Sequence, residues 1–259
     1  MLLGVNIDHI AVLREARKIN DPDPLDALGI VKRSGADQIT IHLREDRRHI
    51  HDEDAQKIIA NASLPVNLEC SINEEMVEKA LMLHPHRVTL VPEKREEVTT
   101  EGGLDVIKNF DTIAQVASKF KKAHIELSLF IDPNVKMIEA SSKLNAQWIE
   151  LHTGSYANIY AMLYSNLAKT HHTILELELD RTQLHEKLKE SLIELDKGAK
   201  YAHSLGLKVA AGHGLNYHNV TDIKRIGEIV ELNIGQSIIA RSIFVGLENA
   251  IKEMVGLLK

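Results

Sequence analysis

Polar and titratable side chains stand two residues apart near the ends of several short apolar segments of this sequence. Side chains with that spacing share one face of a β-strand, so the two members of each pair would point to the same side. Burying such groups costs free energy, and they gather where a protein needs groups that exchange protons. Histidine titrates near neutral pH, and a glutamate in a dry pocket can be raised toward it, which suits general acid–base chemistry. The pairs are Asn6 with Asp8, Thr40 with His42, Asn67 with Glu69, and Glu150 with His152.

The strongest functional candidates among these residues are His42 and Glu69. Both are expected to face inward from segments that are otherwise apolar. A structural role is the alternative for His9, Glu150 and His152, because each could simply satisfy a neighbouring polar group.

The stretch IHLREDRRHIHDED, residues 41–54, holds three histidines, three arginines and five acidic residues directly after an apolar segment. Charge-dense stretches are usually solvated faces of a protein, which is one interpretation. The other interpretation is that its first residues form one wall of an active site. The stretch itself does not separate the two, so the elements around it must decide.

Eight short apolar segments, most of them rich in β-branched residues, recur along the chain with helical periodicity between them. Short apolar segments bounded by turn residues or charges are typical of buried parallel strands. Eight strand–helix units predict a single (β/α)₈ TIM barrel over residues 1–259, with its active site at the carboxyl ends of the strands. A doubly wound open sheet is the alternative, disfavoured because no glycine-rich dinucleotide-binding fingerprint follows the first segment. The predicted strands cover residues 2–8, 38–43, 65–70, 87–92, 124–131, 148–153, 208–213 and 229–235.

The loops after the last two predicted strands have the features of a phosphate site. The segment AAGHGLNYHN, residues 210–219, contains small residues that let the backbone approach a ligand closely. The segment NIGQSIIARSI, residues 233–243, places Gly235 directly before a predicted helix. In this fold a phosphate usually binds to such late loops and to the helix N-terminus that follows them.

Two connections between predicted strands are longer than the fold requires. The polar segment VPEKREEVTTEGGLDV, residues 91–106, is predicted to close over a substrate, with a surface loop as the alternative. Between His152 and Lys208 lie 55 residues, well beyond the length of one crossover helix. We expect one long helix that ends near Gly206 and an additional helical segment before it. We hypothesise that residues 165–190 lie at a subunit contact or at the rim of the mouth.

The composition limits the classes of protein and partner. The formal net charge of -6 gives no indication of a nucleic-acid-binding surface. No stretch reaches the length of a membrane span, and the first residues do not have the pattern of a signal peptide. The single cysteine, Cys70, excludes an intramolecular disulfide. We therefore expect a cytoplasmic protein whose partners are neither nucleic acid nor membrane.

The chain contains, in this order, the segments GVNIDHIAVLREAR, IHLREDRRHI, VPEKREEVTTEGGLD, AGHGLNYHNV and ELNIGQSII. Together they resemble the pyridoxine 5′-phosphate synthases of the deoxyxylulose-phosphate-dependent route to vitamin B6. The resemblance runs from Leu2 to about Leu258, apart from residues 165–190. It implies a (β/α)₈ barrel that assembles into octamers built from dimers and uses no metal or organic cofactor. The implied reaction condenses 1-deoxy-D-xylulose 5-phosphate with 3-amino-2-oxopropyl phosphate to give pyridoxine 5′-phosphate, phosphate and water.

The resemblance also implies roles for individual residues. His42 and Glu69 would be proton acceptors, His213 a proton donor, and Glu150 a group that stabilises charge in the transition state. In that case the stretch that begins at Ile41 includes an active-site wall. The residues expected to bind 3-amino-2-oxopropyl phosphate are Asn6, Arg17, Gly214, Gly235 and Gln236. The residues expected to contact 1-deoxy-D-xylulose 5-phosphate are Asp8, His9, Arg44, His49 and Thr99.

Position 236 departs from the pattern of the family. It is glutamine here, where the family has a histidine after the segment NIG. Glutamine can donate a hydrogen bond to a phosphate, but it cannot carry a proton or a charge. Gln236 is therefore sufficient only if the histidine of the family binds phosphate without titrating.

Other kinds of protein are alternatives to a synthase. A metal-dependent sugar-phosphate barrel enzyme would take its ligands from Asp8, His42, His152 and His213, but the nearby arginines would repel a cation. A Schiff-base aldolase is disfavoured because no lysine ends a predicted strand. A non-catalytic barrel that binds phosphate ligands predicts tight binding that does not change when Glu69 becomes glutamine.

Overall fold

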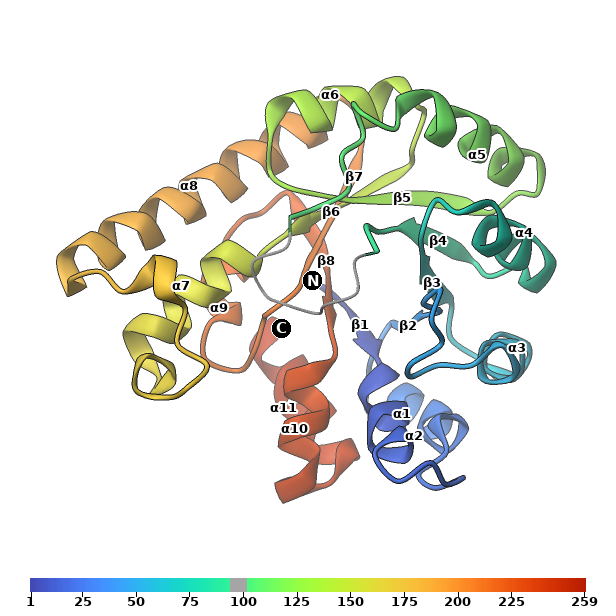
Figure 1. The fold of residues 1–259 in the computed structure, drawn as a ribbon, viewed down its shortest axis with the longest axis horizontal. Coiled ribbons are helices and arrows are strands. Elements are labelled where there is room, and N and C mark those ends of the chain that lie inside the picture. Colours follow the sequence, from blue (N-terminus) through green and yellow to red (C-terminus); the bar gives the residue numbers. More distant parts are fainter. Residues whose placement is uncertain (94–101) are drawn as a thin grey trace.

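The computed structural model describes residues 1–93 and 102–259 and contains a closed barrel of eight parallel strands (Figure 1). The strands follow one another around the barrel in sequence order, and pairing of the first with the last closes it. The predicted (β/α)₈ barrel is confirmed, and the alternative of an open doubly wound sheet is wrong. The strands are β1 (Leu2–Asn6), β2 (Gln38–His42), β3 (Val66–Cys70), β4 (Arg87–Leu90), β5 (Glu126–Ile131), β6 (Trp148–His152), β7 (Lys208–Gly212) and β8 (Ile229–Ile234).

Helices surround the barrel, as Figure 1 shows. Two of them begin at an asparagine side chain that accepts a backbone N–H, Asn73 from Glu75 and Asn134 from Lys136. Such caps satisfy N–H groups that the first helical turn leaves without a partner. The helices are α1 (Asp8–Glu15), α2 (Ala27–Arg33), α3 (Asp52–Asn61), α4 (Glu74–Leu83), α5 (Phe110–Lys122), α6 (Val135–Lys143), α7 (Gly154–Tyr164), α8 (Arg181–Ser204), α9 (Val220–Lys224), α10 (Gln236–Val245) and α11 (Leu247–Leu258), with 3₁₀ helices η1 (Pro24–Asp26), η2 (Leu167–Lys169) and η3 (Leu175–Leu177).

Alternate residues of the strands serve two different environments. One set is apolar and fully buried, and belongs to the hydrophobic core that includes residues of the surrounding helices, for example Val5, Ile41 and Leu68. The other set is largely polar and makes hydrogen bonds across the barrel interior, for example between Thr89 and Asn67. This alternation follows from the two-residue period of a strand. Every second side chain therefore points into the barrel interior.

An ion pair between Arg87 and Glu231 fills part of the barrel interior. The Nη1 atom of Arg87 donates to Oε1 of Glu231 at 2.7 Å, and the two residues are only 3% and 2% exposed. The guanidinium of Arg87 also lies 3.7 Å from the centroid of the Trp148 ring, which is cation–π contact. Bulky apolar residues usually dominate the interior of such barrels, so buried charge here requires close pairing. The sequence analysis singled out neither partner.

Asn233 connects this ion pair to the end of the barrel where the strands terminate. Its Nδ2 atom donates to Oε2 of Glu150 at 2.7 Å and to Oε1 of Glu231 at 3.4 Å. Its Oδ1 atom accepts from Nε2 of Gln38 at 3.3 Å and from Oγ1 of Thr40 at 3.1 Å. Because both donors and both acceptor positions of the amide are used, the orientation of Asn233 is fixed.

One pair from the sequence analysis is placed differently from its prediction. β1 ends at Asn6 and α1 begins at Asp8, so the prediction that these two residues share a strand face is wrong. The helix start nevertheless brings them together, because the Asp8 backbone N–H donates to Oδ1 of Asn6 at 2.9 Å. The other three pairs lie within β2, β3 and β6, as predicted.

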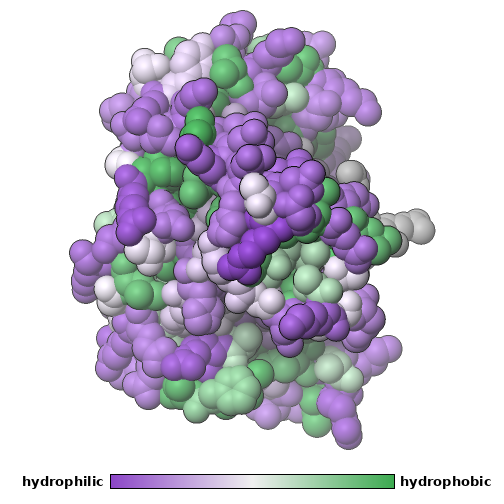
Figure 2. Space-filling model, turned by 90° about the vertical axis from the view of Figure 1, so that its left-hand side faces the viewer, coloured by the Kyte–Doolittle hydropathy of each residue, from purple (hydrophilic) through white to green (hydrophobic). Residues whose placement is uncertain are grey.

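The long connection from β6 to β7 contains α7, η2, η3 and α8, which confirms the predicted long helix and additional helical segment. α8 begins with a reciprocal cap in which Asp180 and Gln183 each accept the backbone N–H of the other. Figure 2 views the molecule from the side on which α8 lies in Figure 1, and hydrophilic residues dominate that face. None of the helices in the described ranges is long and apolar enough to cross a membrane.

We predict that Arg87→Ala lowers the free energy of unfolding by about 3–5 kcal/mol, because it leaves the Glu231 carboxylate buried without its partner. Urea unfolding at neutral pH measures the loss. Arg225→Ala is the control, since it breaks an exposed pair with Asp222 and should have a much smaller effect. Equal losses in the two variants would show that the buried pair does not stabilise the barrel.

Candidate active site

A cavity of about 430 Å³ opens at the carboxyl ends of the strands. The structure brings together in its lining all of the predicted site residues except Arg17 and Thr99. These are Asn6, Asp8, His9, His42, Arg44, His49, Glu69, Glu150, His213, Gly214, Gly235 and Gln236, and Phe130, His152 and Asn233 line the cavity with them. The carboxyl ends of the strands thus form one shared mouth, while the roles of its residues stay predictions.

Two predicted site residues are not among these lining residues. Arg17 is exposed in the turn that follows α1. Thr99 lies outside the described residues. Residues 165–190 do not line the cavity either, so this lining gives no support to their placement at the rim of the mouth. Their placement at a subunit contact stays a prediction.

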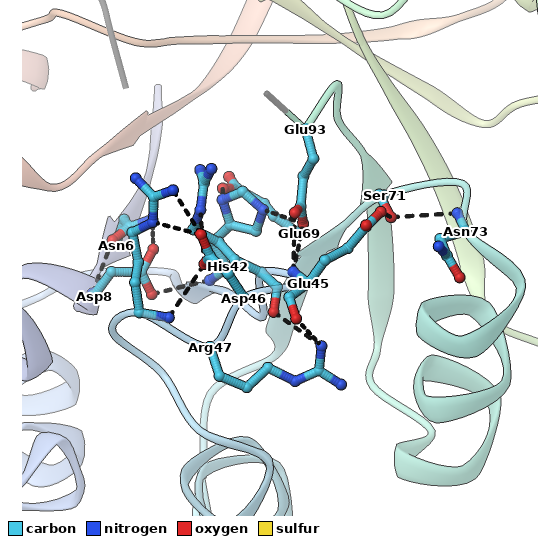
Figure 3. A network of polar contacts seen from close by, with 12 residues as sticks. Asn6, Asp8, His42, Glu45, Asp46, Arg47, Glu69, Ser71, Asn73 and Glu93 are labelled. Atoms are coloured by element: carbon cyan, nitrogen blue, oxygen red, sulfur yellow. Dashed lines mark hydrogen bonds and ion pairs between the residues drawn. The ribbon is translucent and has the colours of Figure 1, made fainter. Parts of the chain in front are cut away.

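Asp8 ties together β1, α1 and β2 at one side of the mouth (Figure 3). Its Oδ1 atom accepts the backbone N–H of His42 at 2.9 Å, and its Oδ2 atom accepts from Nδ2 of Asn6 at 2.9 Å. Burial raises the pKa of Asp8, although the nearby His42 and the accepted hydrogen bonds oppose that shift. These hydrogen bonds hold the Asp8 carboxyl group in place at the edge of the mouth.

The imidazole of His42 lies between two carboxyl groups (Figure 3). Its Nε2 atom is 3.3 Å from Oε1 of Glu93, and its Nδ1 atom is 4.0 Å from Oε2 of Glu69. Both carboxylate oxygens of Glu93 also accept the backbone N–H of Glu45, at 3.1 and 2.9 Å. Burial opposes ionisation of Glu93, but the hydrogen bonds from His42 and Glu45 outweigh it and lower its pKa.

Glu69 and Glu150 lie in surroundings that raise their pKa values, in contrast to Glu93. Burial, with the like charges of Glu150 and Asp8 nearby, raises the pKa of Glu69 well above its ordinary value. Burial also raises the pKa of Glu150, to about 7, although the hydrogen bond from Asn233 opposes part of that shift. A Cβ atom at Gly212 would overlap the Glu150 carboxylate, so glycine leaves the space this group needs. Acids tuned in this way can both hold and release protons near neutral pH.

Two histidines lie side by side at the ends of β6 and β7. The rings of His152 and His213 meet edge to face with their centroids 5.0 Å apart. Nδ1 of His152 is 3.1 Å from Oδ1 of Asp132, which also accepts the backbone N–H of Gly103 at 3.1 Å. The hydrogen bond from His152 lowers the pKa of Asp132 despite its partial burial. Asp132 therefore orients His152 as an ionised partner.

His213 has a backbone conformation that few residues other than glycine adopt. Its φ angle is 79°, and Gly214 follows it with a φ angle of 81°. The Oγ1 atom of Thr153 lies 2.6 Å from the carbonyl oxygens of both Gly212 and His213, and it can donate to either. The Nδ2 atom of Asn219 donates to the carbonyl of Gly214 at 3.1 Å. These bonds hold the turn that presents the His213 side chain to the mouth.

The mouth has two positions suited to phosphate groups. α10 begins at Gln236 directly after Gly235, so the N-terminus of this helix, which favours a bound anion, lies at the end of β8. Arg44 and His49 line the mouth after β2, where their side chains supply positive charge or hydrogen-bond donors. A ligand that carries two phosphates, or two ligands with one each, would match this arrangement.

The sequence analysis missed Glu93 and Asp132, whose carboxylates lie 3.3 and 3.1 Å from histidines of the mouth. Asp132 directly follows β5, and Glu93 lies shortly after β4. Examination of the residues that follow these two strands, as for the others, would have drawn attention to both. Their partners His42 and His152 come from different strands, so the pairing itself depends on how the barrel closes.

Two of the side chains proposed as ligands in a metal-dependent enzyme make hydrogen bonds to other groups of the protein. Asp8 accepts hydrogen bonds from Asn6 and from the His42 backbone, and His152 pairs with Asp132. Within residues 1–93 and 102–259, no three His, Cys, Asp or Glu side chains are placed to hold a metal ion. The described part of the chain thus offers no ligand cluster for that alternative.

Comparison with known proteins gives a consistent result along the whole chain. The family described as "Pyridoxal phosphate biosynthesis protein PdxJ" matches residues 3–259. A protein of Aliarcobacter butzleri named pyridoxine 5′-phosphate synthase is 65% identical over 259 residues, covering 100% of this chain and 99% of that protein. A protein of the same name from Sulfurovum is 64% identical over 258 residues, with 100% of both chains covered.

A solved structure of a protein with little sequence similarity shares the fold. Thiamine phosphate pyrophosphorylase from Pyrococcus furiosus superposes with a TM-score of 0.57 at 12% identity, covering 99% of this chain and 95% of that chain. At that identity the likeness concerns the barrel alone.

We predict that Glu150→Gln makes the stability of the protein against unfolding less sensitive to rising pH. Because the pKa of Glu150 is raised from 4.5 to about 7, the folded state holds this proton more tightly than the unfolded chain does. Wild type therefore loses stability as pH rises through this interval, and the loss is complete above it. The variant lacks that loss. Its free energy of unfolding relative to that of wild type should therefore rise by on the order of 2–3 kcal/mol between pH 4.5 and values above pH 7.

Urea unfolding across that pH range measures the difference between the two proteins. Glu190→Gln on α8 is the control, because that residue is exposed and its replacement should leave the pH profile of wild type unchanged. Parallel profiles for wild type and Glu150→Gln would show that the buried carboxyl has an ordinary pKa.

Proposed function

The chain belongs to the family of the pyridoxal phosphate biosynthesis protein PdxJ, and on that premise we propose that its barrel mouth makes pyridoxine 5′-phosphate. The reaction condenses 1-deoxy-D-xylulose 5-phosphate with 3-amino-2-oxopropyl phosphate and releases inorganic phosphate and water. Closing a pyridine ring from these two compounds requires imine formation, several dehydrations and the loss of one phosphate. Each step moves protons, so the site needs several groups that exchange protons near neutral pH.

One observation carries the assignment of this chemistry to the mouth. Acids whose pKa values are raised by burial, Glu69 and Glu150, share a single cavity with His42 and His213. Two positions suited to phosphate lie in the same lining, one of them at the start of α10. Two phosphorylated substrates need two such positions, and a multistep dehydration needs several proton-exchanging groups close to both.

We assign 3-amino-2-oxopropyl phosphate to the part of the mouth formed after β7 and β8. Gly214, Gly235 and Gln236 lie there in the cavity lining, and Asn6 lines the cavity from the end of the neighbouring β1. Backbone N–H groups at the start of α10 favour a bound anion. Arg17 belongs to this set by resemblance alone, because it is exposed after α1.

We assign 1-deoxy-D-xylulose 5-phosphate to the part of the mouth formed after β1 and β2. Asp8, His9, Arg44 and His49 line it, and Arg44 offers a planar guanidinium that suits phosphate oxygens. Thr99 joins this set on the resemblance alone, since it lies outside the described residues.

The proton transfers fall to the groups between these two positions. Glu69 and His42 accept protons, and His213 donates them from the opposite side of the mouth. Glu150 stabilises charge that develops in the transition state, held in place by the Nδ2 atom of Asn233 at 2.7 Å. No metal ion or organic cofactor takes part in this scheme.

The proposal extends to the setting of the enzyme. We place it in the cytoplasm, in keeping with a single cysteine whose thiol pKa is raised to about 12 by burial, which leaves it unreactive. We also propose an octamer built from dimers. Exposed apolar side chains such as Ile243 and Phe244 at the end of α10 provide surface that association would cover.

We predict that purified protein forms pyridoxine 5′-phosphate from the two substrates at the same rate with and without EDTA. Glu69→Gln should lower kcat by at least about 10²-fold, because an amide cannot exchange the proton that a carboxyl group can. A discontinuous assay of product measures both effects. Calorimetric titration of the variant with 1-deoxy-D-xylulose 5-phosphate checks that it still binds.

Three outcomes would count against the proposal. Loss of activity in EDTA, restored by a divalent cation, would favour the metal-dependent alternative. Tight binding of both phosphorylated substrates without turnover in folded wild type would favour the non-catalytic barrel. Full activity of Glu69→Gln would remove that residue from the proton transfers.

We predict that Gln236→His changes the KM for 3-amino-2-oxopropyl phosphate by less than about threefold and leaves the pH dependence of kcat unchanged. The reason is that a phosphate at the start of α10 needs only an N–H donor at this position, which glutamine supplies. Steady-state kinetics over a range of pH provide the measurement. A new titration in the kcat profile of the variant would show that a histidine at position 236 takes part in proton transfer.

A further inference from the structure

Glu93 lies against His42 at the mouth, although neither the resemblance nor the scheme above gives it a role. Its carboxylate contacts Nε2 of His42, whose Nδ1 faces Glu69 on the other side of the ring (Figure 3). We propose that Glu93 is a positioning residue that joins His42 and Glu69 into a single proton-transfer unit. The inference rests on the proposed function and adds to it the way in which its two proton acceptors cooperate.

The orientation of the Glu93 carboxylate is set by the backbone. Its Oε1 and Oε2 atoms accept the N–H of Glu45 at 3.1 and 2.9 Å, and its side chain is only 8% exposed. Oε1 then faces Nε2 of His42 at 3.3 Å. The backbone of the loop after β2 thus holds the Glu93 carboxylate at a fixed distance from the ring of His42, which ends β2.

The charge of Glu93 follows from a comparison of the carboxyl groups around His42. Burial raises the pKa of Asp8, which faces His42 from α1, and the pKa of Glu69, which faces it from β3. The pKa of Glu93 is lowered by the hydrogen bonds it accepts and by the nearby charge of Arg44. Glu93 is therefore the carboxyl group in this set whose surroundings most favour the ionised form.

An ionised carboxylate decides which nitrogen of His42 carries the proton. It can only accept hydrogen bonds, so Nε2 of His42 must donate to it. In the neutral ring Nδ1 is then the acceptor, and it points toward Oε2 of Glu69 at 4.0 Å. That distance is longer than a hydrogen bond, and catalytic contacts of this kind often shorten once substrate is bound.

The resulting unit moves one proton with all charges accounted for. When the O–H bond of the Glu69 carboxyl breaks, its proton forms an N–H bond at Nδ1 of His42. Glu69 becomes a carboxylate that can accept a proton from substrate, and His42 becomes an imidazolium stabilised by Glu93. The reverse transfer restores Glu69 as an acid for a later dehydration. A buried acid with a raised pKa can thereby act as a base without releasing its proton to water.

Glu93→Gln tests the unit through kinetics, because glutamine keeps the size of the side chain and removes its charge. We expect kcat to fall about 10- to 100-fold, with the KM of each substrate within about threefold of wild type. Glu45→Gln is the matched control. Its carboxylate contacts Ser71 and its backbone N–H is retained, so its kcat should stay near that of wild type.

A double variant separates positioning of His42 from a general structural effect. In a His42→Asn background, Glu93→Gln should cause no further loss of kcat, because the residue through which it acts is gone. A loss of the same size in both backgrounds would overturn the inference, as would a kcat of Glu93→Gln within twofold of wild type. A raised KM with unchanged kcat would show instead that Glu93 acts in substrate binding.

The proton position on His42 can be measured without turnover. ¹⁵N NMR of histidine-labelled protein, with the His42 signals assigned by comparison with His42→Asn, should show the proton at Nε2 in wild type and a mixture of tautomers in Glu93→Gln. A proton at Nδ1 in wild type would refute the inference whatever the reaction proves to be. If the assay for pyridoxine 5′-phosphate fails while the tautomer is as expected, the proposed reaction is wrong and the positioning stands.

Discussion

The buried ion pair between Arg87 and Glu231 is the interaction on which the rest of this site depends. Charge inside a barrel is tolerated only when it is closely paired, and this pair is 2.7 Å apart with almost no exposure. Asn233 donates to Glu231 of this pair and to Glu150 at the mouth, so the orientation set by the pair is passed on to a mouth residue. The interior of the barrel is therefore part of the active site and more than its support.

Burial and partners divide the acids of the mouth into two kinds. Glu69 and Glu150 have few compensating donors for their burial, so their pKa values rise and they are suited to hold protons. Glu93 and Asp132 accept hydrogen bonds from histidines and from backbone N–H groups, so their pKa values fall and they stay ionised. Residues of the same chemical type thus take different roles, and the roles follow from their surroundings.

The sequence predicted the fold well because its signals are local. A buried parallel strand needs a short apolar segment, and each predicted segment contains an observed strand. The same periodicity placed Glu69 and Glu150 at strand ends. It failed for Asp8, which reaches the mouth from the start of a helix, and alternation along a strand cannot anticipate that. It also gave no reason to single out Arg87 or Glu231, because a polar residue within a strand does not reveal its partner.

The sequence by itself determined the order of the elements, the number of strands, the family to be expected and most of the residues that line the mouth. Only the tertiary structure decided which of these residues touch. His42 at the end of β2 meets Glu93 from the loop after β4, and His152 at the end of β6 meets Asp132, which follows the neighbouring β5. These pairings, and the pKa shifts that accompany them, arise from closure of the barrel. Closure brings separate strand ends within hydrogen-bond distance and removes the water that would otherwise screen their charges from one another.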